Sequence, residues 1–463
     1  MMYTFPNKLR NLAITLMVVG FLGLTYGFLN APSTLEESKS MVSANHGDGH
    51  SKSGSVDLGT ISEHQTDSQH DTKEIVHGSE STHSDSKTHQ DVSHDSDHDE
   101  HVFHQLSNKP WAAFYVAAFF FFMISLGVLA FYAIQRAAQA GWSPVLYRVM
   151  EGITAYLLPG GIIIIIILAL SGMHLNHLFI WMDPEVVAHD KLIAGKTGYL
   201  NVPFFLLRAV FFLSGWSLYR YFSRKFSLAQ DSADDISNHK KNFRISAAFL
   251  VFFIVTESVM SWDWIMSIDP HWFSTLFGWY VFASMVVSGV TTIALITIYL
   301  KSKGFLEFVN DSHIHDLAKF MFGFSVFWTY LWFSQFMLIW FSNIPEEVTY
   351  FITRIEDYNL PFFGMLVMNF IFPLLILINS DFKRINYFVV MAGIVIILGH
   401  YIDIYNMIMP SAVGDQWYIG APEIGGFLFF LGLFIFIVFK ELTKSPLLAK
   451  GDPYMGESKR FHY

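Results

Sequence analysis

Stretches of about twenty apolar residues recur along this chain, and each is long enough to cross the ~30 Å hydrocarbon core of a bilayer as a helix. In lipid only helices and closed barrels satisfy their backbone polar groups, and these runs are too long and too continuously apolar for barrel strands. The sequence therefore predicts an all-α, polytopic membrane protein. Ten transmembrane helices are expected, at roughly 9–29, 111–134, 153–173, 203–222, 244–262, 272–300, 317–341, 359–378, 387–409 and 423–440.

Two parts of the chain carry nearly the same short motifs in the same order. The run Asn-Val-Pro-Phe-Phe at 201–205 is echoed by Asn-Leu-Pro-Phe-Phe at 359–363, and both runs open an apolar span. Further along each copy, Asp263 and Asp403 stand seven residues before a proline. Matching motifs on corresponding spans indicate duplication of a four-helix unit, and repeated membrane bundles often hold their working site where the repeats meet.

This repeat and the shifts in composition divide the chain into five parts. We expect an N-terminal transmembrane helix (1–30), a His-, Asp- and Ser-rich outer loop (31–110), a first four-helix bundle (111–271), a second four-helix bundle (272–410), and a last transmembrane helix with a cytoplasmic tail (411–463). The first helix follows Lys8 and Arg10, as in a signal peptide, but no small-residue cleavage site precedes Asn30, and we expect the helix to be retained.

The segment 31–110 holds fifteen acidic residues, five lysines and eleven histidines, and it lacks the apolar content of a core. We expect it to be largely disordered, as a solvated tether. The alternative is loose metal binding, with His94, His98 and His101 as candidate ligands, although no fixed ligand spacing recurs.

Charge and cysteine content limit the function further. With both termini cytoplasmic, the inner segments hold 20 of the 29 Lys and Arg residues, as the positive-inside rule requires, and the His-rich loop is then periplasmic. The chain has no cysteine, which excludes a Cys-ligated iron–sulfur cluster, a c-type haem attachment and disulfides. No Walker-type Gly-Lys-Ser/Thr loop is present, so ATP-driven transport by this chain alone is not expected. Membrane lipid, and no nucleic acid, is the expected environment.

Ionisable residues inside the spans mark candidate functional groups, because they are costly in a membrane. Arg208 and Glu257 each stand five residues from the outer end of their spans, on consecutive antiparallel helices, and are candidate ion-pair partners. Asp263, at the outer edge, is the alternative partner of Arg208. The Trp and Tyr residues at 262–280 and 417–418 are expected in the interfacial aromatic belt.

His400 and Asp403 lie deeper, on one helical face, and His174 caps the third span on the same outer side. A haem held by two histidines is disfavoured, because of these only His400 is deep. The inner half of the membrane is expected to be much poorer in such groups. The pattern indicates a polar chamber opening outward, for a proton relay or a quinone headgroup, with structural salt bridges as the alternative.

Two longer motifs resemble a known family. The first motif is the run Ser-Trp-Asp-Trp-Ile-Met-Ser-Ile-Asp-Pro-His-Trp-Phe-Ser-Thr-Leu-Phe-Gly-Trp-Tyr at 261–280, and the second is the run Gln-Phe-Met-Leu-Ile-Trp-Phe-Ser-Asn-Ile-Pro-Glu-Glu at 335–347. Both are similar to the second large membrane subunit of alternative complex III. That subunit belongs to the polysulfide-reductase (NrfD-like) membrane family. The resemblance covers roughly residues 109–440, while the His-rich segment departs from it.

The resemblance implies two parallel-repeat four-helix bundles flanked by a first and a last helix, in a bacterial cytoplasmic membrane. It also implies a quinol:cytochrome c oxidoreductase, in which this chain is non-catalytic alone. The implied partners are a paralogous NrfD-like membrane subunit, an iron–sulfur subunit, and multihaem and monohaem cytochrome c subunits, which carry the haems and clusters. A proton path is implied at Glu257, Asp263, His400 and Asp403, with His174 and Arg208 beside it, and menaquinone contact is left open.

A rival hypothesis from another functional class is a stand-alone secondary transporter, coupled to protons or a metal. Parallel repeats and polar residues near the midplane are also typical of transporters. The two hypotheses differ in partners, because a transporter works alone and a complex subunit co-purifies with haem proteins.

Overall fold

The computed structural model describes residues 2–46 and 88–462, and side chains from 2 to 41 and from 102 to 462. The chain forms two compact units, one made of Met1–Ala31 with Asn108–Tyr463 and the other of Pro32–Ser107. The second unit holds α2 (Leu35–His46) and the start of α3 (Thr88–Ala137), which are helical parts of the segment expected to be disordered. The metal-binding alternative at His94, His98 and His101 falls on side chains outside the described residues.

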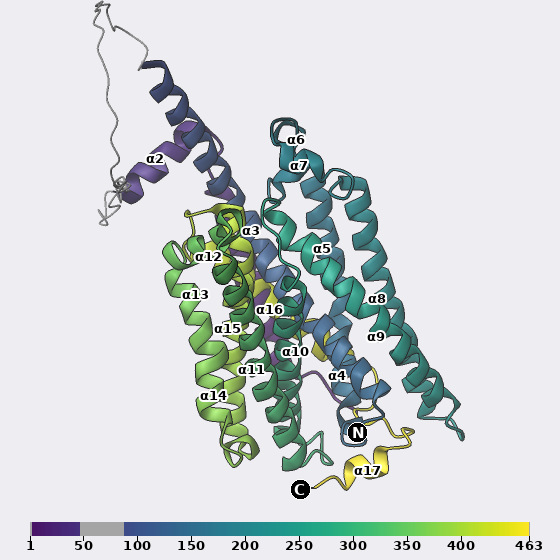
Figure 1. Ribbon diagram of the computed structural model, residues 1–463. Coiled ribbons are helices and arrows are strands. Elements are labelled where there is room, and N and C mark those ends of the chain that lie inside the picture. Colours follow the sequence, from purple (N-terminus) through teal and green to yellow (C-terminus); the bar gives the residue numbers. More distant parts are fainter. Residues whose placement is uncertain (1, 47–87, 463) are drawn as a thin grey trace, which may run out of the picture. The chain divides into compact units, whose positions relative to one another are not determined.

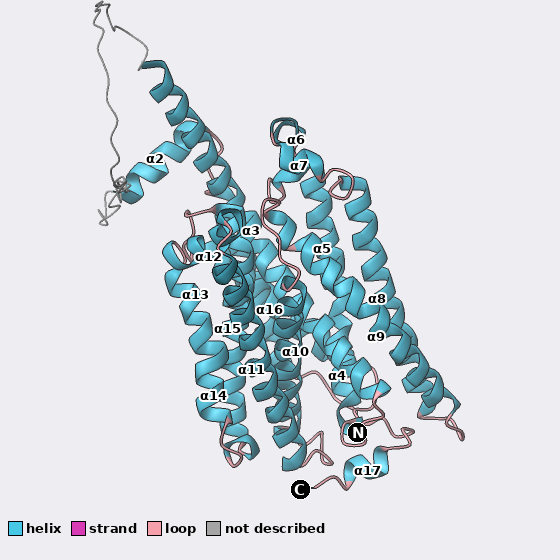
Figure 2. Ribbon diagram, viewed as in Figure 1, coloured by secondary structure: helices cyan, strands magenta, loops and turns pink. Residues whose placement is uncertain are grey.

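Within the part of the chain that the structure describes, ten helical segments are long and apolar enough to cross a membrane, and no strand is present (Figure 2). This confirms the prediction of an all-α, multi-pass membrane protein. The segments are Asn7–Leu29, Val102–Ala137, Pro144–Gly172, Val202–Gln230, Ser237–Ile268, Phe277–Ser302, Asp311–Ser342, Asn359–Leu377, Asn386–Val413 and Ala421–Leu442.

The long helices form two sets of four and one pair (Figure 1). The first set is α3, α4 (Tyr147–Ile153) with α5 (Leu157–Gly172), α8 (Val202–Gln230) and α9 (Ser237–Trp264). The second set is α10 (Phe277–Ser302), α11 (Asp311–Ser342), α13 (Asn359–Leu366) with α14 (Phe372–Leu377), and α15 (Asn386–Val413). The pair is α1 (Asn7–Leu29) and α16 (Ala421–Leu442), which are the first and last membrane helices. Short helices lie at the helix ends: α6 (Pro184–His189), α7 (Lys191–Gly195), α12 (Pro345–Glu356) and α17 (Met455–Lys459).

Small residues allow the helices of the pair to pack backbone against backbone. A Cβ atom at Gly20 of α1 would overlap the backbone of Phe429, and one at Gly425 of α16 would meet the backbone of Gly23 and Leu24. Close approach through glycines is a general route to helix association in membranes, where hydrocarbon supplies no hydrophobic drive between helices.

The two sets of four meet through their first helices. Gly127 of α3 packs against the backbone of Met285 of α10, and Gly289 of α10 packs against the backbone of Gly127 and Val128. Most of the apolar part of both helices is buried inside the protein, unlike the lipid-accessible α8, α9 and α11. The helices α3 and α10 therefore lie at the centre of this compact unit.

The repeated Asn-x-Pro-Phe-Phe motif starts its two helices in different ways. Asn201 precedes α8 and its side chain accepts a hydrogen bond from the backbone N–H of Phe204 at 3.0 Å, which is an N-cap. Asn359 is already the first residue of α13, and its Nδ2 donates to the carbonyl of Ile355 at 3.1 Å, in the preceding α12. The amphipathic α12 thus takes part in the start of α13.

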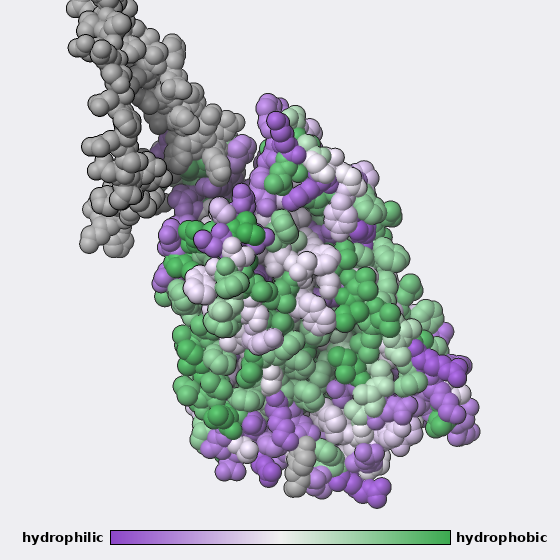
Figure 3. All heavy atoms as spheres, viewed as in Figure 1, coloured by the Kyte–Doolittle hydropathy of each residue, from purple (hydrophilic) through white to green (hydrophobic). Residues whose placement is uncertain are grey.

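Both termini lie at one end of the helices, where the ring of Tyr3 packs on Phe305 and Phe439 (Figure 1). We call this end the terminal face, and the opposite end, which carries α6, α7 and α12, the loop face. A hydrophobic band separates hydrophilic residues at the two ends of the visible surface (Figure 3). The band matches a bilayer crossed by the long helices.

Candidate functional site

Arg208 and Asp263 form a buried ion pair near the loop face of the first set. Arg208 Nε donates to Asp263 Oδ2 at 2.6 Å and Arg208 Nη2 donates to Oδ1 at 3.0 Å. The Tyr199 hydroxyl donates to Asp263 Oδ1 at 2.9 Å. Asp263 has no exposed surface and Arg208 retains 8%. The fork of the guanidinium matches both carboxylate oxygens, which is the strong geometry for such a pair.

Asp263, and not Glu257, is therefore the partner of Arg208. In helices the long side chains point toward the helix N-terminus. For Arg208 on α8 this direction leads to the loop face, whereas for Glu257 on the antiparallel α9 it leads away from it. Glu257 is buried and its Oε1 accepts a hydrogen bond from Ser261 at 3.2 Å, one turn further along the same helix.

His400 and Asp403 meet in the second set, as their spacing on α15 predicts. The imidazole Nδ1 lies 3.4 Å from Asp403 Oδ2 and 2.9 Å from the hydroxyl of Ser284 on α10. Neither His400 nor Asp403 has any exposed surface. Two more donors reach the carboxylate, because the Tyr280 hydroxyl donates to Oδ1 and Trp328 Nε1 donates to Oδ2 at 2.9 Å.

This arrangement, which we call the His400–Asp403 site, draws on three helices of one set. Both oxygens of the buried carboxylate are thus hydrogen-bonded, which offsets the cost of burying a polar group. The other imidazole nitrogen, Nε2 of His400, has no hydrogen-bond partner in the described structure. The site therefore encloses a histidine–aspartate pair with one imidazole nitrogen left without a partner in the described structure.

A π-helical turn lies beside the site. Residues Val367–Ile371, between α13 and α14, form this turn, and π turns in helices often mark functional positions. The turn places the fully buried Asn369 against Gly399, next to His400, so closely that a Cβ at Gly399 would overlap Asn369 Oδ1. Neither polar atom of the Asn369 side chain has a hydrogen-bond partner in the described structure.

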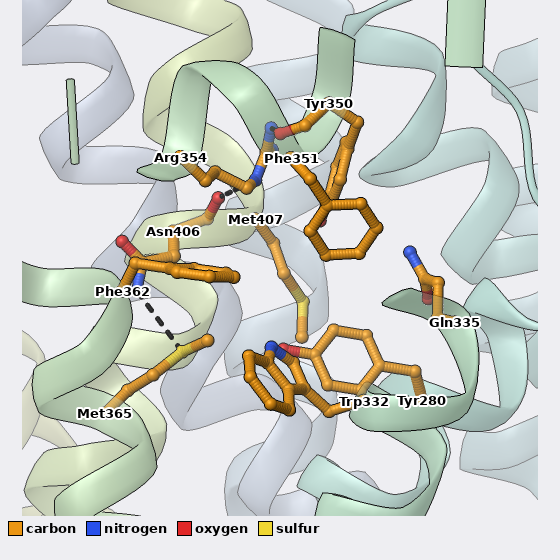
Figure 4. Close-up of a pocket in the computed structure, with 10 residues that line it drawn as sticks. All are labelled: Tyr280, Trp332, Gln335, Tyr350, Phe351, Arg354, Phe362, Met365, Asn406 and Met407. Atoms are coloured by element: carbon orange, nitrogen blue, oxygen red, sulfur yellow. Dashed lines mark hydrogen bonds between the residues drawn. The ribbon is translucent and has the colours of Figure 1, made fainter. Parts of the chain in front are cut away.

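A narrow cavity adjoins the site on the side of the loop face (Figure 4). Tyr280 belongs to both, and the space holds about one water molecule. Arg354 of α12 lies at its edge, donating from Nε to the carbonyl of Asn406 at 3.0 Å. Several buried polar atoms around the cavity have no partner within the described structure: Arg354 Nη2, Gln335 Oε1, Trp332 Nε1 and Asn406 Oδ1.

The two sites are separate. Among the described residues no hydrogen bond or ion pair joins the Arg208–Asp263 pair to the His400–Asp403 site. The two sites therefore do not belong to one directly connected polar network. His174 belongs to neither site, because it is exposed in the turn after α5 with a positive φ of 59°.

A larger cavity of about 260 Å³ opens at the loop face beside the first site. Tyr199, which donates to Asp263, forms part of its wall, and the aromatic rings of Trp262, Trp272 and Phe273 form much of the rest. Lys196 also lines it, with its Nζ donating to the carbonyl of Pro270 at 2.5 Å.

Buried ionisable groups also lie at the terminal ends of the first set. Arg136 and Arg148 are buried there and bind carboxylates, with Arg136 Nη1 at 2.7 Å from Asp452 and Arg148 Nη1 at 2.7 Å from Glu151. The only sequence signal is the i, i+3 spacing of Arg148 and Glu151. Asp452 comes from the C-terminal tail, which no local pattern connects to these helices.

Sequence reasoning also assigned Tyr280 to the interfacial belt, whereas this residue is only 3% exposed and binds Asp403. Its neighbour Trp279 is 44% exposed, as an interfacial residue would be. Trp328 and Ser284 gave no signal of their own, because tryptophan and serine are common in apolar helices.

The chain matches no protein-family model, and no curated protein matches it significantly. Its function is therefore inferred from the residues and their geometry.

Proposed function

We propose that this chain is a proton-conducting membrane subunit of a quinol:cytochrome c oxidoreductase of the alternative complex III type. In this proposal it is non-catalytic alone and acts with a paralogous NrfD-like subunit, an iron–sulfur subunit and cytochrome c subunits. Quinol oxidation releases protons, and a membrane subunit with enclosed titratable groups can carry them. The motifs at 261–280 and 335–347 support the assignment to this family.

The observation that carries the proposal is the His400–Asp403 site. A histidine and an aspartate, both without exposed surface, lie 3.4 Å apart inside an otherwise apolar helix. Ionisable residues at such depth are costly, and their presence is best explained by a task that needs a proton-binding group there. A cavity with room for about one water adjoins the site and supplies the kind of link that a proton relay uses.

In this proposal the membrane is the bacterial cytoplasmic membrane, and the distribution of basic residues supports the terminal face as its cytoplasmic side. Lys8, Arg10, Arg224 and Lys444 all lie toward this face, in agreement with the positive-inside rule. The loop face is then periplasmic, where the cytochrome partners of such a complex would dock.

Of the two cavities beside the candidate sites, only the one at the loop face is large enough to propose for a menaquinone ring. The narrow cavity beside Asp403 holds about one water, which is too little for a naphthoquinone ring, so no quinone step is assigned there. The cavity of about 260 Å³ at the loop face has the aromatic walls of Trp262 and Trp272 to hold such a ring. When bound, menaquinol would supply electrons and protons. The polar groups that this chain itself supplies beside the cavity would be Tyr199 and Asp263, which are hydrogen-bonded to each other.

The test is proton release per electron by the assembled complex in sealed vesicles, with quinol and cytochrome c as substrates. We expect Asp403→Asn and His400→Gln to lower proton release per electron, while the complex still assembles with its haems. Asp415→Asn is the matched control, since Asp415 is an exposed aspartate at the loop face. Unchanged proton release in both site variants would refute the proton-path role.

A secondary transporter remains the second candidate, and the meeting of two equivalent helices at Gly127 and Gly289 favours it. Purification in mild detergent distinguishes the complex subunit from the transporter. Co-elution with c-type haem and quinol-dependent cytochrome c reduction supports the complex subunit. A colourless protein that purifies alone and moves protons or metal ions supports the transporter.

A further inference from the structure

A buried charge network fills the terminal end of the first set. Arg148 bridges Glu151 at 2.7 Å and Asp231 at 2.6 Å, and Arg136 lies 3.9 Å from Glu151. Hydroxyl groups extend the network toward the membrane, because Arg136 Nε donates to the Tyr132 hydroxyl at 3.0 Å. Further along, Ser223 donates to Tyr132 at 3.3 Å and to Asn242 at 2.7 Å.

The C-terminal tail closes this network from outside the helices. Asp452 Oδ2 accepts from Arg136 Nη1 at 2.7 Å, so the tail supplies one of the carboxylates. Gly451 lies so close to the end of α8 that a Cβ would overlap the carbonyl oxygen of Gln230. The tail is anchored again at Ser458, whose hydroxyl donates to the carbonyl of Trp142 at 2.6 Å.

A small cavity lies where the tail meets α8 and α9. Arg136, Asn242, His239 and Asp452 line it, and its volume corresponds to about one water molecule. His239 is 8% exposed, and its Nδ1 has no hydrogen-bond partner within the described structure. This nitrogen lies 3.6 Å from Asp452 Oδ2, which is an ionic distance but longer than a hydrogen bond.

We propose that His239 and Asp452 form a proton-exchange site at the terminal face, with the C-terminal tail as an integral part of it. His239 Nδ1 takes up the excess proton of a hydronium ion in the cavity, which leaves a neutral water molecule, and the Asp452 carboxylate balances the charge of the imidazolium. The proton returns to cavity water from the same nitrogen. This inference rests on the proposed function, because the site exchanges protons with water at the face opposite the His400–Asp403 site, where uptake for the proposed path would begin.

The surroundings of the pair fit this exchange. Arg136 is the charged group that faces Asp452 from α3, and the ring of Tyr454 packs on His239 from the tail at 5.7 Å between centroids. Burial acts to raise the pKa of Asp452, but His239 and Arg136 outweigh it and hold this pKa below its ordinary value. Asp452 is therefore ionised at neutral pH and available to balance a proton on His239.

The first test uses the full chain in lipid nanodiscs and does not depend on partners. Hydrogen–deuterium exchange at the imidazole carbon, followed by mass spectrometry, measures the access of water to each histidine. We expect His239 to exchange within about tenfold of the exposed His462, and far faster than the enclosed His400. Exchange of His239 as slow as that of His400 would overturn the proposal.

The second test measures proton uptake from the terminal side by the assembled complex in vesicles. We expect His239→Gln and Asp452→Asn to slow uptake by about tenfold or more. His462→Gln and Asp234→Asn are matched controls on the same face, and both residues are exposed. Asp452→Asn leaves Arg136 with a weaker partner, and this variant could lose its fold for that reason alone. In that event the uptake measured for His239→Gln decides the test.

The outcomes separate this inference from the proposed function. If Asp403→Asn lowers proton release while His239→Gln and Asp452→Asn leave uptake unchanged, the proposed function stands and the exchange site is refuted. If the Asp403 variant is also without effect, the proposed function fails. The exchange rate of His239 then still decides whether this site contacts water.

Discussion

Arg208 and Asp263 lie almost wholly out of solvent, so the removal of either partner leaves an uncompensated charge inside the protein. We expect Arg208→Met and Asp263→Leu each to destabilise the fold by about 3–5 kcal/mol, the usual cost of breaking a buried pair. The double variant should recover much of this loss, because it buries no lone charge. Thermal unfolding in detergent, monitored by tryptophan fluorescence, measures the stability of the two single variants and of the double variant.

A control for the ion pair is available on the surface. Lys301 and Asp311 are 2.9 Å apart, but 71% of the Asp311 side chain is exposed. Asp311→Asn should therefore change stability by about 1 kcal/mol or less. A similar loss in the surface and buried variants would show that the buried pair is not held in the geometry described.

At the second site, Tyr280 and Trp328 each donate one hydrogen bond to Asp403. We expect Tyr280→Phe to destabilise the protein by about 1–3 kcal/mol, because a buried carboxylate loses a donor. Tyr299→Phe, on the same helix but toward the terminal face, should have little effect. A stable Tyr280→Phe protein with unchanged proton release would mean that this donor is dispensable.

At the scale of the element, the π turn Val367–Ile371 depends on a glycine of the neighbouring helix. Gly399→Ala places a Cβ against Asn369, and overpacking of this kind costs about 1–3 kcal/mol. Gly364→Ala is the matched control, since nothing lies within 4 Å of its added Cβ, and it should be neutral or slightly stabilising. Melting temperatures of the two variants give the comparison, and equal values would contradict the close packing.

The elements could be predicted from the sequence far better than the contacts between them. Apolar runs fix where membrane helices form, because lipid offers no other partner for the backbone. The pairing of Arg208 could not be fixed by depth alone, since the direction of its side chain along α8 decides between Asp263 and Glu257. The π geometry around Asn369 gave no signal, because the other residues of the turn are as apolar as those of a regular membrane helix.

At the scale of the whole molecule, contacts between segments far apart in the sequence could not be predicted. His400 and Asp403 were found because one helix carries both. Asp452 reaches Arg136 across 316 residues of sequence, and nothing near either residue indicates the contact. Local patterns therefore predict sites built on one element, whereas a site completed by a tail requires the three-dimensional fold.

Docking of the tail should depend on pH through Asp452. Its pKa is held below the ordinary value of 3.8, so docking is stabilised above that pH and loses this contribution as the pH falls below it.

The chain has no cysteine, so spin labels at Asp234→Cys and Arg460→Cys can report the distance between tail and loop. We expect the distance to be constant from about pH 8 to pH 5 and to lengthen below about pH 4. In the Asp452→Asn background the distance distribution should be broader and should not change across this range. A tail that detaches above pH 5 in the unsubstituted chain would show that another group controls docking, and His239, which faces the same carboxylate, would be the next to replace.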